Sequence, residues 1–141
     1  MKRLYNLWVA LLVLMLLSFA SCSKDEPADN TQPTAVILTP LEQDEFIRGQ
    51  SLIFNGVFED DRKLSHVEIS IAENSSLKGF DTPWEATEVI ELMGKSTEIN
   101  GYELFDGEIP ADIMSGNYSL KVLVVDKALN FSSYNVGIVI E

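Results

Sequence analysis

The residues best suited to hold a metal ion are acidic and fall in two separate turn-like segments. The first segment is Glu59-Asp60-Asp61, and the second contains Asp126 and Asn130. Calcium takes six to eight oxygen ligands, mostly carboxylates and carbonyls, so the two segments together could supply a weak site. The alternative is turn chemistry, because Asp and Asn side chains also bond to nearby backbone amides and permit tight turns. The sequence favours turn chemistry, leaves weak calcium binding open, and predicts no other cofactor.

Two aromatic residues form a second candidate site. Phe80 and Trp84 flank Asp81-Thr82-Pro83 within residues 76–85, a segment that is predicted to be a long loop. Exposed aromatic rings stack on sugars and anchor protein interfaces, so this pair is a candidate ligand-binding platform. The alternative is that one or both rings fill the rim of the core.

The sequence shows no evident arrangement of residues for catalysis. His66 is the single histidine and Cys22 the single cysteine, whereas metal and nucleophile chemistry needs partners at defined geometry. We expect His66 to lie on the outward face of a strand. The 22 acidic residues are scattered, and none stands out as a glycosidase-type pair. The chain is therefore predicted not to be an enzyme.

The N-terminus has the order of a secretory signal peptide. Met1-Lys2-Arg3 is positive, a mostly apolar run is densest from Leu7 to Leu17, and small residues precede Cys22. A transmembrane helix is the alternative, but an acidic, proline-containing stretch follows where a stop-transfer flank would be basic. We expect residues 1–21 to be removed.

The residues around the expected cleavage point resemble two lipoprotein signals. Phe19-Ala20-Ser21-Cys22 resembles the bacterial lipobox, which implies that Cys22 carries lipid and anchors the protein to a membrane. Ser23-Lys24-Asp25-Glu26 resembles the surface-export signal of Bacteroidetes lipoproteins. The resemblance implies an outer-membrane protein displayed on the cell surface, with the periplasmic face as the alternative.

Charge and composition limit the partners of the mature chain. Loss of Lys2 and Arg3 with the leader moves the formal net charge from −12 to −14. Such a chain is not expected to bind nucleic acid, which requires clustered Lys and Arg, or to dock on anionic lipid head groups. Residues 22–33 begin with the lipidated cysteine and carry no large apolar side chain after it, so they are predicted to form a flexible tether.

Residues 34–141 are the size of one domain, and their apolar side chains alternate with a period of two. The strongest strands are predicted at 50–58, 65–72, 118–126 and 132–140, and weaker strands at 34–38, 87–92 and 102–109. Turn signals separate the segments, among them Asn100-Gly101. About seven short strands predict an all-β, antiparallel β-sandwich.

The order of these strands resembles an immunoglobulin-like domain. Tyr118-Ser119-Leu120 resembles the start of strand F with its corner tyrosine, and Ile69 would fill the core position of strand C. Residues 56–67 and 115–130 are similar to bacterial immunoglobulin-like modules, although Leu129 replaces a usual glycine. With the lipobox, the whole chain resembles Bacteroidetes lipoproteins that carry a domain of unknown function.

This resemblance implies a position for the acidic segments and a class of function. The resemblance makes 50–58, 65–72, 118–126 and 132–140 the strands B, C, F and G. Loops B–C and F–G lie at one end of an immunoglobulin-like sandwich, which would bring the two acidic segments together. We expect a non-enzymatic binding or interaction module with a glycan or protein ligand. The alternative is a structural accessory subunit of an outer-membrane complex without its own ligand. An exposed Phe80–Trp84 pair would favour the first, and an exposed apolar patch the second.

Overall fold

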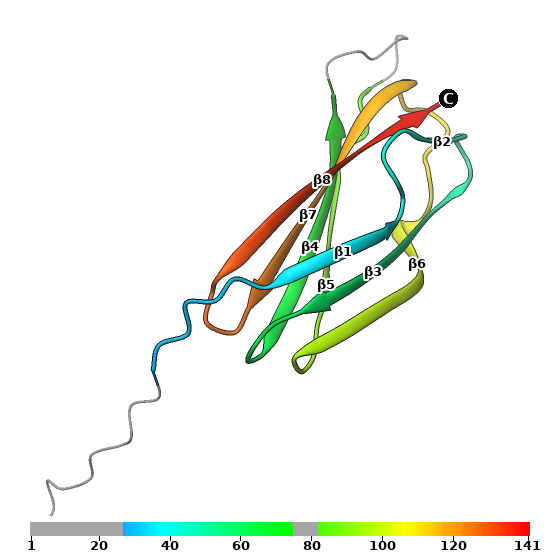
Figure 1. Cartoon of the computed structure of the whole chain (residues 1–141). Helices are drawn as coiled ribbons and strands as arrows, with labels where there is room; N and C mark the ends of the chain where they lie inside the picture. Colours follow the sequence, from blue (N-terminus) through cyan, green and yellow to red (C-terminus); the bar gives the residue numbers. More distant parts are fainter. Residues whose placement is uncertain (1–26, 75–81) are drawn as a thin grey trace, which may run out of the picture.

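Eight strands lie within residues 27–74 and 82–141, the parts of the chain that this computed structural model describes. One sheet has the order β1-β3-β6, and the other has the order β2-β8-β7-β4-β5. The two sheets pack face to face (Figure 1). The strands are β1 (Thr34–Thr39), β2 (Asp44–Phe46), β3 (Ser51–Glu59), β4 (Leu64–Glu73), β5 (Ala86–Glu91), β6 (Ser96–Glu108), β7 (Gly116–Asp126) and β8 (Phe131–Ile140).

The core lies between the sheets and follows the two-residue period of the sequence. In β3, Leu52, Phe54 and Phe58 are fully buried, and the rings of Phe54 and Phe58 stack with centroids 6.3 Å apart. A side chain at Gly56 would place its Cβ 3.2 Å from both rings, so glycine permits this stack. Ile69 in β4 is also fully buried, at the predicted core position.

The predicted all-β, immunoglobulin-like sandwich is confirmed, with two differences in detail. β2 was not predicted, and it pairs with β8 in parallel rather than antiparallel. The Asn100-Gly101 pair does not end a strand, because β6 runs through it. Opposite Asn55 of β3 the register shifts, Gly101 has φ 64°, and its amide donates to Asn55 Oδ1. The Asn-Gly signal therefore marks a β-bulge rather than a turn between strands.

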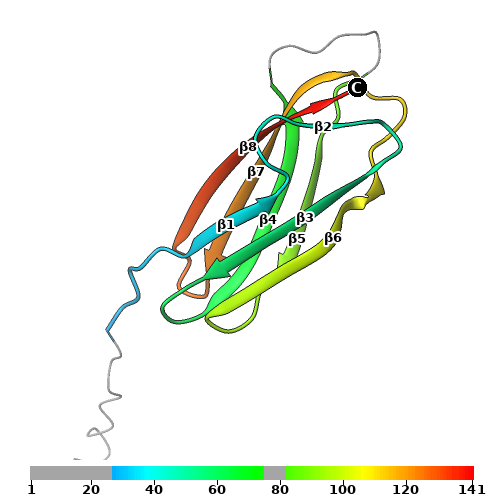
Figure 2. The same cartoon turned by 45° about the vertical axis from the view of Figure 1, so that its right-hand side comes forward.

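The N-terminal segment and the C-terminus lie at opposite ends of the sandwich (Figures 1 and 2). Residues 27–33 join at one end, together with the turns at 60–63, 92–95 and 127–130 that connect β3 to β4, β5 to β6 and β7 to β8. We call this the tether end. The opposite end holds residues 40–50 and the C-terminal Glu141. Among the described residues, no helix has the length and apolar character needed to cross a membrane.

Candidate metal site

Backbone hydrogen bonds join the three turns of the tether end into one unit. The amide of Asp60 donates to the carbonyl of Lys95 over 2.8 Å, which connects the first turn to the second. The amide of Lys127 donates to the carbonyl of Lys63 over 2.9 Å, which connects the third turn to the first. The backbones of these three turns are therefore held next to one another.

The described part of the expected tether lies against this unit. Residues 27–33 form no strand, but Arg62 Nη2 donates to the carbonyl of Pro27 over 2.8 Å. Asn130 Nδ2 donates to the carbonyl of Asp29 over 3.2 Å, and Ser132 Oγ donates to the carbonyl of Pro33 over 2.6 Å. These contacts bring an acidic residue of the segment, Asp29, to the turns.

Three carboxylates converge at the tether end. Each of Asp29, Asp60 and Asp126 offers a carboxylate oxygen, and these oxygens all lie within 4.8 Å of one another. Asp126 is fully buried. Within residues 27–74 and 82–141, no other three Asp, Glu, His or Cys side chains come together in this way.

Asp60 leaves one buried oxygen without a donor. Its Oδ2 accepts hydrogen bonds from the backbone amides of Arg62 and Lys63, which is the turn chemistry that the sequence favours. Its Oδ1 is buried and accepts no hydrogen bond from any described residue. An unpaired buried carboxylate oxygen is costly, so this atom favours a cation or a hydrogen-bond donor such as water as its partner.

Asp126 has hydrogen-bond donors on both oxygens. Oδ1 accepts from the backbone amide of Asn130 over 2.8 Å, and Oδ2 accepts from Asn130 Nδ2 over 2.7 Å. Leu129 completes this tight turn with φ 71°, the left-handed conformation that glycine adopts more easily. Turn chemistry and a shared metal ion are compatible here, because a carboxylate oxygen has more than one lone pair.

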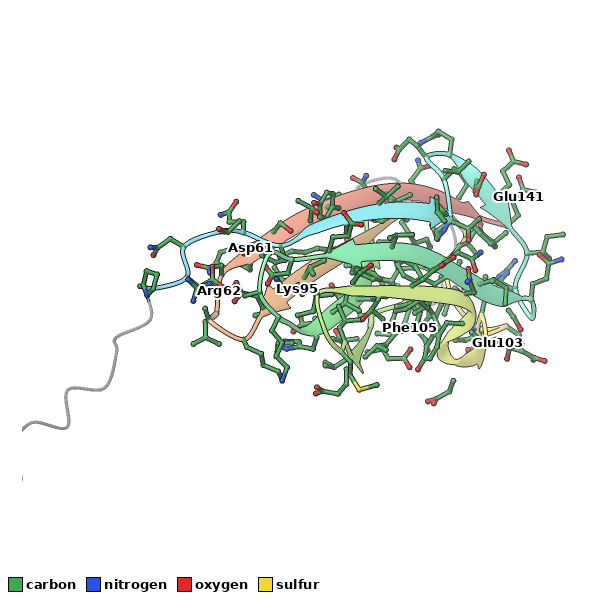
Figure 3. The ribbon with its side chains drawn as sticks, turned by 60° about the horizontal axis from the view of Figure 1, so that its bottom comes forward. Asp61, Arg62, Lys95, Glu103, Phe105 and Glu141 are labelled. Atoms are coloured by element: carbon green, nitrogen blue, oxygen red, sulfur yellow. The ribbon has the colours of Figure 1, made fainter. Side chains whose placement is uncertain are left out.

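Four cationic residues lie in the turns of the tether end, but only one of them forms an ion pair with the three carboxylates among the described residues. The one ion pair among the described residues joins Arg62 Nε to Asp29 Oδ2 over 3.7 Å, and the Arg62 side chain is 39% exposed. Lys95 Nζ instead donates to the carbonyl of Asp61, and Lys127 Nζ donates to Ser65 Oγ. Figure 3 shows Asp61, Arg62 and Lys95 gathered at the tether end. Among the described residues, one partly exposed guanidinium is therefore the cationic group in ion-pair distance of the three carboxylates.

The spacing of the three oxygens is compatible with a calcium ion. Calcium–oxygen distances of about 2.3–2.6 Å allow two ligand oxygens of one ion to lie as much as about 5 Å apart. Oxygens that all lie within 4.8 Å of one another can therefore bind the same ion. Magnesium needs shorter distances and strict octahedral geometry, which loop carboxylates satisfy less easily. The remaining ligand positions would fall to water and backbone carbonyls.

The acidic residues singled out in the sequence are only partly brought together. Asp60, Asp126 and Asn130 meet at the tether end, but Glu59 is exposed and lies in β3, where it pairs with Thr34 and Ser96. Asp61 is also exposed, and its Oδ2 accepts from Thr31 Oγ1 over 3.3 Å.

Asp29 is not among the predicted ligands, because its segment is predicted to be a tether. The one feature of the sequence that could indicate Asp29 as a ligand is its position. An acidic residue five places before the first strand lies within reach of the turns at the same end of the sandwich.

The aromatic candidate site is only partly within the described residues. Trp84 is 7% exposed, and its ring meets the ring of Phe105 edge to face with centroids 5.3 Å apart (Phe105 in Figure 3). Its backbone amide donates to the hydroxyl of Tyr118, which in turn donates to the carbonyl of Met114 over 2.6 Å. Trp84 thus fills the rim of the core and presents no open ring face. Phe80 and Cys22 lie outside the described residues.

Two tyrosines have shifted acidities, and neither belongs to the carboxylate cluster. Burial raises the pKa of Tyr118. The hydrogen bond that Tyr102 donates to Glu88 raises the pKa of Tyr102. The other oxygen of Glu88 accepts from the backbone amide of Phe105 over 2.8 Å, so Glu88 stabilises β6.

His66 is half-buried beside Ser65, which contacts its Nδ1 over 3.1 Å.

Comparisons with known proteins give a family and one solved structure of low similarity. None of the curated proteins matches the chain. A solved structure of fibronectin(III)-like modules of Clostridium thermocellum CbhA is similar, with 15% identity and a TM-score of 0.45. That match covers 76% of this chain and 94% of the other. The family described as Domain of unknown function (DUF4625) matches residues 20–141, and the chain therefore belongs to the DUF4625 family.

Proposed function

We propose that this protein is a non-enzymatic, calcium-binding interaction module of a bacterial cell envelope. Lipid on Cys22 anchors it to the outer membrane in the manner of Bacteroidetes surface lipoproteins, and the sandwich binds a partner outside the lipid. The observation that carries the proposal is the close approach of the Asp29, Asp60 and Asp126 carboxylates in a cluster where one of the residues, Asp60, also has a buried oxygen without a donor. Calcium abounds outside cells, and extracellular modules bind it with dissociation constants of about 0.1–1 mM.

Calcium binding is tested by calorimetric titration and thermal unfolding of the full-length protein in detergent. With a dissociation constant near 0.1 mM, 10 mM calcium would add about 2.7 kcal/mol to the free energy of unfolding. In a domain of this size the melting temperature should rise by about 10 °C. Magnesium at the same concentration should give a much smaller rise.

Two variants separate a site from general screening of negative charge. Asp126→Asn should abolish the calcium-specific rise, because it removes one of the three converging carboxylates. Asp61→Asn removes the same charge from a neighbouring turn and should retain the rise. Equal small shifts with calcium and magnesium, unchanged in both variants, would show screening and end the calcium proposal.

The anchor is tested by membrane fractionation and mass spectrometry. Cys22→Ala should prevent acylation and move the protein from the membrane to the soluble fraction, whereas wild type should carry acyl chains. Protease shaving of intact cells then distinguishes surface display from the periplasmic face. A Cys22→Ala protein that stays in the membrane fraction, with a wild type free of lipid, would refute the anchor.

An accessory subunit of an envelope complex is the second candidate, and exposed apolar residues favour it. Val36 is 60% exposed and Leu38 is 45% exposed, and both lie on β1, an edge strand of the three-stranded sheet. An apolar edge suits a protein contact better than a sugar. The buried ring of Trp84 removes one support for a glycan platform. A pull-down from intact cells with wild type and with Val36→Asp decides between these partners.

A further inference from the structure

The proposed calcium ligands come from two parts of the chain that differ in how firmly they are held. Asp60 lies on the turn between β3 and β4, Asp126 is the last residue of β7, and the turns that follow these two strands are joined by backbone hydrogen bonds. Asp29 lies in residues 27–33, which form no strand. We propose that calcium clamps this N-terminal segment to the sandwich, so that the ion sets how the domain is held on its anchor. This inference rests on the proposed function.

The segment has little else to hold it in place between Pro27 and Gln32. Pro33 is buried and fixes one end, but the residues before it carry no large apolar side chain. Their contacts with the turns are hydrogen bonds and one ion pair of side chains, such as Thr31 Oγ1 to Asp61 Oδ2 over 3.3 Å. Contacts of this kind contribute little against the entropy of ordering a segment.

Without a cation, the Asp29 side chain opposes its own docking. It is only 8% exposed, and it lies beside two further carboxylates, of which Asp126 is fully buried. Like charges at this distance repel, and Arg62 supplies a single positive charge at 3.7 Å. A divalent cation between the three oxygens reverses the sign of the interaction. Calcium should therefore favour the docked segment over the released one.

Docking changes the reach of the chain between the anchor and the domain. Eleven residues, 23–33, separate Cys22 from β1, and a fully extended chain of that length spans at most about 36–40 Å. When Asp29 is fixed to the sandwich, six residues remain, 23–28, with a limit of about 20–22 Å. Calcium would thus hold the tether end near the membrane and direct the opposite end outward.

The experiment is hydrogen exchange by mass spectrometry on the full-length protein in detergent, in 10 mM calcium, 10 mM magnesium or chelator. The amides of residues 28–32 should exchange at least about tenfold more slowly in calcium, whereas those of β4 should not change. Asp29→Asn should abolish this protection and weaken calcium binding by at least about tenfold. Glu45→Gln, an exposed acid at the opposite end, should behave as wild type.

Each outcome separates the clamp from the calcium site itself. Calcium binding without a change in exchange at 28–32 overturns the clamp and leaves the site intact. Wild-type calcium affinity in Asp29→Asn does the same, because the segment then contributes no ligand. Absence of any calcium binding overturns the site and the clamp together.

Discussion

The two ends of the sandwich use the same residue types in different ways. At the opposite end, Glu42 Oε2 accepts from the backbone amide of Gly137 over 2.7 Å, and its Oε1 accepts from Gln43 Nε2 over 3.3 Å. At the tether end, three carboxylates share one space and Asp60 Oδ1 has no donor among the described residues. The Glu42 carboxylate is satisfied on both oxygens by donors of the chain, whereas the tether-end cluster keeps one buried carboxylate oxygen without a donor and so leaves a place for a cation.

At the opposite end, the contact between Glu42 and β8 depends on a glycine. A Cβ at position 137 would lie 2.6 Å from Glu42 Oε1, so the carboxylate approaches this strand only because the residue is glycine. The amide of Gln43, which has φ 68°, donates to the carbonyl of Gly137 over 2.7 Å. The Glu42 carboxylate finds all its hydrogen-bond donors within the chain. The stability of this end should therefore not depend on calcium.

The largest expected effect on stability comes from the core between the two ends, and it should not depend on calcium. Leu120 is fully buried in β7, so Leu120→Ala should lower the free energy of unfolding by about 2–5 kcal/mol. Its neighbour Ser119 faces outward, and Ser119→Ala should cost less than about 0.5 kcal/mol. Denaturant unfolding should give the same two values in calcium and in chelator. Equal losses in both variants would contradict the register of β7.

At the opposite end, Gly137→Ala should cost about 1–3 kcal/mol. The added methyl group displaces Glu42 and leaves the amide of residue 137 with a poorer acceptor. Because no cation takes part, the loss should be the same with and without calcium. A loss that calcium restores would erase the contrast between the two ends.

At the tether end, Asp60→Asn should act in opposite directions in the two buffers. In chelator the protein should be as stable as wild type or more stable, by up to about 1 kcal/mol, because a repulsive charge is removed. In 10 mM calcium it should be less stable than wild type, because the gain of about 2.7 kcal/mol is lost. The measurement is a pair of unfolding curves for each protein, one in chelator and one in calcium. A loss of the same size in both buffers would indicate a purely structural carboxylate.

The smallest effect concerns the turn that follows Asp126. Leu129 is 78% exposed and has φ 71°, so its side chain contributes strain and little packing. Leu129→Gly should raise the free energy of unfolding by about 0.5–1 kcal/mol, the relief of strain exceeding the added freedom of the unfolded chain. Thermal unfolding in chelator checks this gain. A loss of stability would mean that Leu129 has a packing role that its exposure conceals.

The fold follows from the sequence where side chains alternate over long stretches. The period of two in residues 50–58 and 118–126 predicts β3 and β7 because one face of each strand is buried. β2 has only three residues and contacts the sheet through β8 alone, so no local pattern predicts it. Asn100-Gly101 marks a bulge because its partner across the sheet, Asn55, accepts the glycine amide.

The candidate site was within reach of the sequence only in part. The segments around Asp60 and Asp126 follow strands that end at the same end of a sandwich, so the resemblance to an immunoglobulin-like domain brings them together. Asp29 comes from a segment without apolar residues, whose position depends on side-chain hydrogen bonds to distant turns. Such contacts leave no periodic signal in the sequence.

The most direct measurement is a crystal structure of the mature protein grown in calcium, with anomalous diffraction data. We predict one anomalous peak at the tether end, about 2.3–2.6 Å from carboxylate oxygens of Asp29, Asp60 and Asp126. Asp60 Oδ1 should be among the ligands, and residues 27–33 should be docked. An ion-free cluster in saturating calcium, with the Arg62 guanidinium or water between the carboxylates, would contradict a calcium site at this end.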